Sequence, residues 1–264
     1  MSKIEIPFYW LDVFTSEPFK GNPVAVFMMN TDLDDSLYLK LAKELKLSKI
    51  AFTEKIGESE YKLRYFSPNG EVPLCGHATI GTAYTLSTEY NVQSQITFQT
   101  RDEQIEVEID GSQITINFPQ RPLPDSHYDG MAAPLGIKEY EECYVVMFVL
   151  KNREQVEKVN PDYRAFRAYC EAHDMSAAIV TALDDSGECD YLCRVFMMDE
   201  EDPVTGLSQC YLAPYWSKRL GKSKMRCHQI SHRPGIVSVE LVDDVVRITS
   251  KATMLMKGTL SLPI

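Results

Sequence analysis

The sequence lacks any long apolar run and any excess of basic residues. No window approaches the roughly 18 uncharged apolar residues of a membrane helix, and the N-terminus "MSKIEIPFYWLDVF" lacks the apolar core and cleavage site of a signal peptide. The net charge of -11 argues against a nucleic-acid partner, because such a partner requires a basic face. We therefore expect a cytoplasmic protein with neither a membrane nor a nucleic-acid partner.

Cysteines are present, but they form no recognisable pattern. The seven cysteines are scattered, with no CxxC pair and no histidine–cysteine cluster at zinc spacing. An odd number of thiols without an export signal favours reduced cysteines, and we expect no metal site. The 264 residues, 44% of them hydrophobic, suffice for one large domain or two of ordinary size.

An internal repeat appears when the chain is shifted against itself by 130 residues. "RYFSPNGEVPLCG" (64–76) then falls on "RVFMMDEEDPVTG" (194–206), with five identities in 13 positions. The identical pairs are Arg64 and Arg194, Phe66 and Phe196, Glu71 and Glu201, Pro73 and Pro203, and Gly76 and Gly206. Identities at this level arise by chance as well, so the flanking patterns decide the interpretation.

The flanks of both motifs follow the same order. The patterns predict helices at 34–46 and 161–173, strands at 62–66 and 190–196, helices at 77–87 and 207–220, and then strands at 95–100, 104–109, 113–118, 225–230, 236–241 and 245–250. This order favours an α+β protein of two similar halves, residues 1–118 and 125–264. The proline-rich segment 119–124 is the predicted crossover between them.

In each half, a loop ending in glycine opens the central helix. The first turn of a helix leaves backbone N–H groups unpaired and carries the positive end of the dipole. Gly76 and Gly206 allow a ligand to approach that backbone closely, since they have no side chain. Either glycine alone indicates ordinary capping, but two at matching positions predict a cleft that binds a small carboxylate.

The two loops also contain groups that can transfer or orient protons. His77 lies at the first helix start, where a neutral imidazole can exchange a proton near neutral pH. Asp202 precedes Pro203 in the second loop and could orient a basic group or a substrate amine. Local hydrogen bonding at a helix start or a turn explains either residue as well.

Four motifs together resemble the PhzF-like (phenazine biosynthesis-like) isomerase family. They are "FKGNPVAVF" (19–27), "LSKIAF" (47–52), "EVPLCGHATIG" (71–81) and "DPVTG" (202–206), and they span most of the chain. The resemblance implies the fold of diaminopimelate epimerase: two pseudo-symmetric domains, each a curved β-barrel-like sheet around a central helix. It also implies a homodimer that needs no cofactor and moves a proton between carbons of a small amino or hydroxy acid.

The resemblance assigns site residues and also exposes two departures. Catalytic roles fall on His77, Asp202 and Lys49, where the family has glutamate at the position of Lys49. Substrate contacts fall on Asn22, Gly76, Ala78, Gly206, Leu207 and Ser208. The family has serine at the position of Leu207, and Ser208 lies one residue further, turned by about 100 degrees on a helix.

The related epimerases place one thiol at each helix start, whereas this chain has Cys75 at the first and Thr205 at the second. A threonine hydroxyl is far too weak an acid to replace a thiolate, which argues against a two-thiol racemase. Cys75 is therefore interpreted as structural.

Three hypotheses remain open for the function. The protein is an active isomerase that uses a lysine of lowered pKa or His77 alone, a catalytically silent relative that binds a small carboxylate, or a dimeric scaffold for another protein. For the first, we expect Lys49 to stay charged and to pair with a substrate carboxylate, because an anionic substrate favours the ammonium form. His77 is then the only proton carrier.

Overall fold

The computed structural model describes residues 3–30, 33–93, 95–121, 123 and 129–263. Contacts divide the chain into unit 1, Met1–Asn117 with Thr249–Ile264, and unit 2, Phe118–Ile248. The C-terminal segment therefore belongs with the N-terminal unit, whereas the sequence placed all of 125–264 in the second half. The predicted crossover, 119–124, lies in part outside the described residues.

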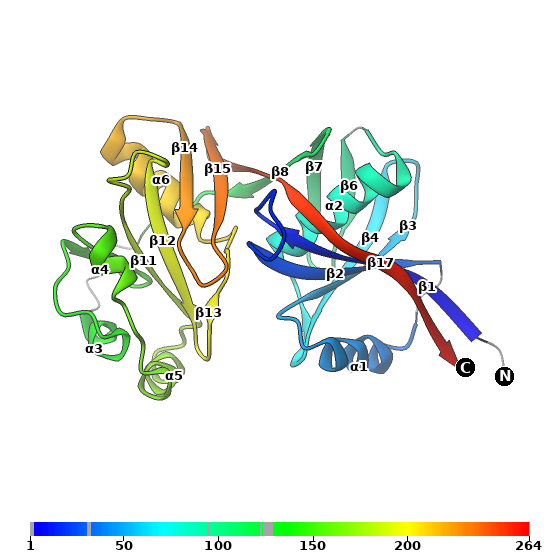
Figure 1. Cartoon of the computed structure of the whole chain (residues 1–264), viewed down its shortest axis with the longest axis horizontal. Helices are drawn as coiled ribbons and strands as arrows, with labels where there is room; N and C mark the ends of the chain where they lie inside the picture. The colour runs from blue at the N-terminus through cyan, green and yellow to red at the C-terminus, as the bar shows by residue number, and fades with distance from the viewer. Residues whose placement is uncertain (1–2, 31–32, 94, 122, 124–128, 264) are drawn as a thin grey trace. The chain divides into compact units, whose positions relative to one another are not determined.

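Both units are built from short strands and a few helices (Figure 1). The first eight strands and two helices are β1 (Lys3–Val13), β2 (Asn22–Met29), α1 (Asp35–Leu45), β3 (Ile50–Lys55), β4 (Glu60–Ser67), β5 (Gly70–Val72), α2 (Gly76–Tyr90), β6 (Ile96–Gln99), β7 (Gln104–Asp110) and β8 (Gln113–Pro119). A 3-10 turn (Asp129–Met131) follows, and then α3 (Ala132–Leu135), β9 (Glu142–Cys143), β10 (Met147–Val149), α4 (Arg153–Glu157), α5 (Tyr163–Ala172), β11 (Ala177–Leu183), β12 (Tyr191–Met197) and β13 (Glu201–Asp202). The chain ends with α6 (Gln209–Leu220), β14 (Lys224–Gln229), β15 (Gly235–Val242), β16 (Val245–Ser250) and β17 (Ala252–Pro263).

The strand pairing of unit 1 recurs in unit 2. In unit 1, β2 pairs in parallel with β3, β3 antiparallel with β4, β4 antiparallel with β5, β4 in parallel with β6, and β6 antiparallel with β7. The same five relations join β10 with β11, β11 with β12, β12 with β13, β12 with β14, and β14 with β15. The predicted repeat and the α+β class are therefore confirmed.

Strand β2 shows why the sheet of unit 1 carries helices on both faces. Phe27 belongs to a buried cluster with Tyr38 of α1, whereas Val24 and the adjacent Val26 face the opposite helix, α2, at Gly81. Successive side chains of a strand point to opposite faces. A strand covered on both faces reads as a nearly continuous apolar run, which is what "NPVAVFMM" shows.

Helices α1 and α5 begin where the sequence predicts. Asp34 accepts a hydrogen bond from the Ser36 backbone N–H, and Asp162 accepts from the backbone N–H groups of Arg164 and Ala165. An aspartate at this position satisfies donors that the first turn leaves unpaired. The predicted helices at 34–46 and 161–173 are confirmed, with ends shifted by one or two residues.

Helix α2 is enclosed almost all round by the sheet of unit 1. Its buried residues include three threonines at helical spacing, Thr79, Thr82 and Thr85. Each hydroxyl donates to the backbone carbonyl four residues earlier, at distances of 2.8–2.9 Å. This internal bonding satisfies polar side chains inside an apolar shell, so the helix needs no exposed face.

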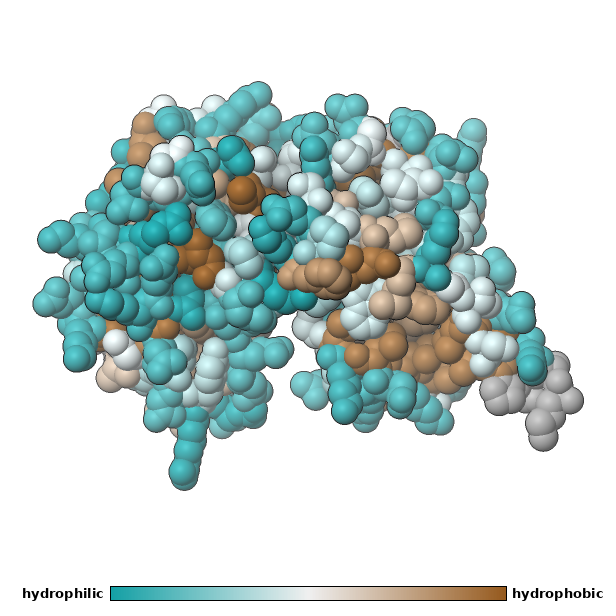
Figure 2. All heavy atoms as spheres, viewed as in Figure 1, coloured by the Kyte–Doolittle hydropathy of each residue, from teal (hydrophilic) through white to brown (hydrophobic). Residues whose placement is uncertain are grey.

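Strand β17 was not predicted from the sequence. It pairs antiparallel with β1 along nearly its whole length, from Lys3↔Pro263 to Val13↔Ala252. Apolar side chains gather over β1, β2 and β17 on the face seen in Figure 2. Met256 of β17 is 51% exposed. The amphipathic pattern of β17 is weak, and the strand is recognised only from its pairing with β1.

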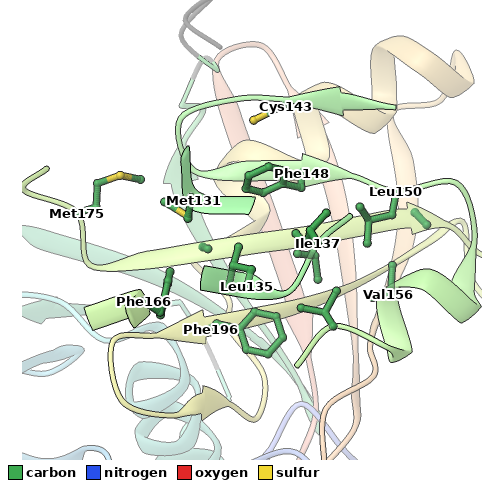
Figure 3. Packing of buried hydrophobic residues seen from close by; sticks show 14 of the residues in the cluster. Met131, Leu135, Ile137, Cys143, Phe148, Leu150, Val156, Phe166, Met175 and Phe196 are labelled. Carbon is green, nitrogen blue, oxygen red and sulfur yellow. The ribbon is translucent and has the colours of Figure 1, made fainter. Parts of the chain in front are cut away.

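The core of unit 2 is a separate cluster, shown in Figure 3. Phe148, Phe166 and Phe196 are fully buried in it and come from β10, α5 and β12. The short helices α3 and α4, which the sequence did not predict, contribute Leu135 and Val156. Across the described ranges of both units, the helices are too short or too polar to span a bilayer.

Candidate active site

An arginine–glutamate fork supports the loop before each central helix. In unit 1, Arg64 donates from Nε and Nη2 to Glu71, at 2.8 and 3.0 Å. In unit 2, Arg194 makes the same pair of bonds to Glu201, at 2.6 and 3.0 Å. Paired N–H···O bonds of this kind fix geometry as well as charge, and they explain two of the five repeated identities.

The third identity completes the same arrangement. The guanidinium of Arg64 lies 5.1 Å from the ring centre of Phe66, and that of Arg194 lies 4.8 Å from Phe196. A cation over an aromatic face is attracted to the ring. Each loop therefore leaves its sheet from an equivalent fixed point.

In unit 1 the loop passes directly into helix α2. Cys75 is the N-cap residue in an extended conformation, and Gly76 is the first helical residue. The Cys75 carbonyl accepts from the Thr79 hydroxyl at 2.9 Å, and that hydroxyl also lies 2.6 Å from the Tyr65 hydroxyl. The helix start is thus tied to strand β4 beneath it.

His77 is held at this helix start as a neutral imidazole. It is 8% exposed, and the Cys75 Sγ lies 3.5 Å from its Nδ1 and 3.8 Å from its Nε2. Burial, together with the positive charge of Lys49, lowers the pKa of His77 from its usual 6.5 to about 3. The imidazole is therefore uncharged at neutral pH in the free protein.

The same electrostatic interaction shows that Lys49 lies near His77. Lys49 immediately precedes strand β3, is half-buried, and donates from Nζ to the Ser48 carbonyl at 3.0 Å. Asn22, the first residue of β2, is fully buried, as is Ala78, which follows His77. The charge of Lys49 therefore acts on His77 within unit 1, while the catalytic roles of both residues and the substrate contacts assigned to Asn22, Gly76 and Ala78 stay predictions.

In unit 2 the corresponding loop is closed by its own side chains. The Asp202 carboxylate accepts a short hydrogen bond from the Thr205 hydroxyl. The amide of Gln229 spans the loop, since its Nε2 donates to the Asp202 carbonyl at 2.7 Å and its Oε1 accepts from the Thr205 N–H at 2.9 Å. Ser231 adds a bond to the Pro203 carbonyl at 2.6 Å.

The predicted helix 207–220 begins two residues too early, so Gly206 is not directly at the helix start. Helix α6 begins at Gln209, after a turn in which the N–H groups of Gln209 and Cys210 donate to the Gly206 and Leu207 carbonyls. Bonds to the third preceding residue tighten the chain before the helix proper. The Ser208 hydroxyl donates to the Thr205 carbonyl at 2.7 Å, and Ser208 is buried within the turn. The substrate contacts assigned to Gly206, Leu207 and Ser208 stay predictions.

Gln229 is the site residue that the sequence analysis missed. It is fully buried at the end of a correctly predicted strand, 225–230. Nothing in a single sequence marks a strand-end glutamine as the partner of a loop 24 residues earlier. Its importance follows only from the fold.

None of the seven cysteines forms a disulfide. All seven are free, which agrees with the expected reduced thiols, and all are buried. Among the side chains that the structure describes, no group of three or more His, Cys, Asp or Glu lies close enough to hold a metal ion. The chemistry that this arrangement offers is proton uptake by a buried imidazole beside a fixed positive charge.

Comparisons with solved structures first define the class of protein. A probable proline racemase from Agrobacterium radiobacter K84 superposes with a TM-score of 0.66 at 11% identity, covering 96% of this chain and 92% of that one. A likeness at this identity concerns the fold alone. Together with the repeated pairing in the two units, it shows an α+β protein of the diaminopimelate epimerase-like fold.

Closer relatives then identify the family. Residues 11–258 match the PhzC-PhzF family, described as phenazine biosynthesis-like protein. An uncharacterized isomerase of Pseudomonas aeruginosa is 35% identical over 98% of this chain and 100% of its own length. A PhzF-family protein of Enterococcus faecalis has a TM-score of 0.90 at 34% identity, covering 97% of this chain and 99% of that one. The chain belongs to the phenazine biosynthesis-like family.

Proposed function

We propose that the protein is a cofactor-free isomerase that moves a proton between two carbons of a small amino or hydroxy acid. His77 carries the proton, and Lys49 binds the substrate carboxylate. The observation that supports this most is the buried, neutral imidazole at the start of α2, with its pKa lowered by burial and by the neighbouring ammonium of Lys49. Relatives named as isomerases agree with this class of reaction.

The electrostatics couple proton uptake to substrate binding. In the free protein, the charge of Lys49 disfavours the imidazolium form of His77. A carboxylate paired with Lys49 offsets that charge, so the pKa of His77 rises when substrate binds. The imidazole then becomes a better base when a carbon acid is present to lose a proton.

The reaction requires one base and a means of stabilising negative charge. His77 removes a proton from the substrate carbon next to the carboxylate, which leaves an enolate anion and an imidazolium. Lys49 and the unpaired N–H groups of the first turn of α2 stabilise that anion, and Gly76 leaves the backbone accessible. In a substrate with a carbon–carbon double bond beside that carbon, the anion is delocalised over the allylic system. Return of the proton from the imidazolium to the far carbon shifts the double bond, regenerates neutral His77 and completes an isomerisation with no net change in oxidation.

Asp202 has a different role in this proposal. Its carboxylate is fixed by Thr205, and its backbone carbonyl by Gln229, which suits an orienting group better than a mobile base. The repeat predicts that both loops act on one substrate, and this stays a prediction. Asp202→Ala is then expected mainly to weaken substrate binding.

Solvent deuterium exchange tests the proposal. The protein is incubated in D2O with a panel of small amino and hydroxy acids, and exchange at carbon is monitored by NMR. We expect His77→Ala to reduce exchange by at least about 100-fold, the lower end of what a positioned acid–base group contributes. Cys75→Ser is the matched control at the same helix start, and it should retain most of the activity. Loss of exchange in Cys75→Ser but not in His77→Ala would reverse the assignment.

A silent carboxylate-binding protein is the second candidate. The lysine at position 49 favours it, since the family has a carboxylate there and a lysine binds an acid without needing to transfer a proton. This candidate predicts calorimetric binding of a small acid that weakens in Lys49→Glu, with no deuterium exchange for any acid of the panel. Binding together with exchange supports the isomerase.

A further inference from the structure

A pocket in unit 2 is lined largely by helix α6, and none of the residues assigned to the candidate active site lines it. Its volume is about 560 Å³, within the roughly 300–1,000 Å³ typical of small-molecule sites. The lining residues are Leu123, Glu142, Tyr144, Tyr211, Pro214, Tyr215, Lys218 and Arg219. The sequence "YLAPYWSKRL", which the proposed reaction does not use, supplies five of them.

Pro214 explains why this side of the helix is indented. Proline has no N–H, so the carbonyl four residues earlier, on Cys210, loses its helical partner. The backbone N–H of Arg121 donates to that carbonyl instead, at 2.9 Å. The segment that leaves β8 is thereby fastened to α6 and forms one side of the pocket.

Aromatic rings form the walls, and two of their hydroxyls are already bonded. Glu142 accepts from the Tyr144 hydroxyl at 2.6 Å and from the Tyr215 hydroxyl at 2.9 Å. The two rings meet edge to face, with centroids 6.0 Å apart. Since these hydroxyls are anchored, the side chains are ordered before any ligand arrives, which lowers the entropic cost of binding.

The charged groups of the pocket differ in whether they are already paired. Arg219 donates to Glu142 at 2.9 Å and to Glu141 at 2.8 Å, so its single positive charge is shared between two carboxylates. Burial opposes ionisation of Glu142, but the hydroxyl bonds and Arg219 outweigh it and lower its pKa, so it stays a bound anion. Lys218 is exposed and has no ion-pair partner among the described residues. Its charge is notable in a chain of net charge -11.

We propose that this pocket is an auxiliary binding site for a planar aromatic carboxylate. The ring stacks among Tyr144, Tyr211 and Tyr215, and the carboxylate pairs with Lys218. Aromatic pairs prefer offset or edge-to-face contact, which rings fixed at this spacing offer to a flat ligand. The predicted site is independent of the isomerase chemistry, because it uses neither His77 nor Lys49.

An NMR titration of the full chain with 1-naphthoate tests the proposal. We expect amide shifts to concentrate at Tyr144, Tyr211 and Lys218. Lys218→Glu should weaken binding at least about fivefold, because it replaces an attractive exposed pair by a repulsive one. Tyr211→Leu should weaken it about tenfold, while Tyr211→Phe, the matched control, binds like the parent.

Two further ligands and one variant make the outcome decisive. Cyclohexanecarboxylate and 1-naphthalenemethanol should each bind several-fold more weakly than 1-naphthoate, since one lacks the flat ring and the other the charge. Lys49→Glu should leave 1-naphthoate binding unchanged, which separates this site from the candidate active site. Equal binding by the neutral alcohol, or shifts centred on His77, would overturn the proposal.

Discussion

The two loops before the central helices share a support but differ in the path that each takes beyond it. Arg64 with Glu71 and Arg194 with Glu201 make the same two-bond fork on matching strands. Beyond the fork, the first loop enters α2 at Gly76, whereas the second makes an extra turn before α6. The duplicated residues therefore determine where each loop starts, and the residues after them determine its chemistry.

The two central helices differ in the same way. Helix α2 is enclosed, and a Cβ added to Gly81 would lie 2.7 Å from Val24 Cγ1 of strand β2. The residue 130 positions later is Tyr211, which lines an open pocket on α6. One copy of the repeat thus has its helix buried for precise placement of His77, and the other keeps a face of its helix open to a ligand.

The largest expected loss of stability comes from replacing the arginine of the unit 2 fork, and it distinguishes the two forks. Arg194 also donates from Nη1 to the carbonyls of Val156, Glu157 and Val159, at 3.1, 3.2 and 2.7 Å. Arg64 instead donates from Nη1 to Asp35, whose side chain is 72% exposed. Arg194→Met should therefore lower the free energy of unfolding by about 3–5 kcal/mol, and Arg64→Met by about 1–3 kcal/mol. Urea denaturation measures both.

A double variant separates the fork from those extra bonds. Arg194→Met with Glu201→Leu removes the uncompensated carboxylate, and it should recover part of the loss because a buried ion pair can be replaced by apolar groups. Equal losses in Arg194→Met and Arg64→Met would show that the carbonyl contacts contribute little, and the asymmetry between the units would not hold.

The next effect concerns the loop that Gln229 closes in unit 2. Gln229→Met leaves the Thr205 N–H and the Asp202 carbonyl buried without this partner, which should cost about 1–3 kcal/mol. In Gln229→Glu, the new side chain can make both bonds only when its carboxyl group is protonated, so the pKa of this group is raised in the folded state. The stability of the variant should therefore fall as the pH increases above about 4.3, the value for an unfolded glutamate. Thermal unfolding from pH 4 to 8 measures this, with the parent as control; a pH-independent difference contradicts the assigned bonds.

The smallest effect tests the enclosure of α2. Gly81→Ala brings a methyl group against Val24 and should destabilise by about 1–3 kcal/mol through overpacking, partly offset by about 1 kcal/mol of better helix propensity. Adding Val24→Ala should relieve the contact and restore part of the stability. A stabilised Gly81→Ala variant would mean that the helix has room to move.

Local sequence patterns predicted the repeat, the α+β class and eight strands, four in each half, because each depends on neighbouring residues. "QIEVEI" and "IVSVEL" alternate with period two, and both form strands. Strand β17 was not predicted, because its partner, β1, lies at the other end of the chain. The late start of α6 and the part played by Gln229 also depend on contacts between distant segments.

At the candidate active site, too, the local sequence predicts some features, while others depend on contacts between distant segments. The motif around His77 identified the residue, but its ionisation state could not be predicted, because burial lowers the pKa more than any neighbouring residue does. A histidine at a helix start would ordinarily titrate near pH 6.5. Burial in the fold keeps His77 neutral at neutral pH, and on the proposed function its protonation depends on a bound ligand.

The central claim is that His77 stays neutral until an anion binds near Lys49. Nitrogen-15 NMR of the imidazole ring, recorded from pH 7 down to the acid limit of the folded protein, measures the pKa of His77 directly. We expect a value near 3 in the free protein, a higher value in Lys49→Gln, and a rise on saturation with an acid that supports deuterium exchange. A pKa of His77 near 6.5 in the free protein, unchanged by Lys49→Gln and by the acid, would contradict it.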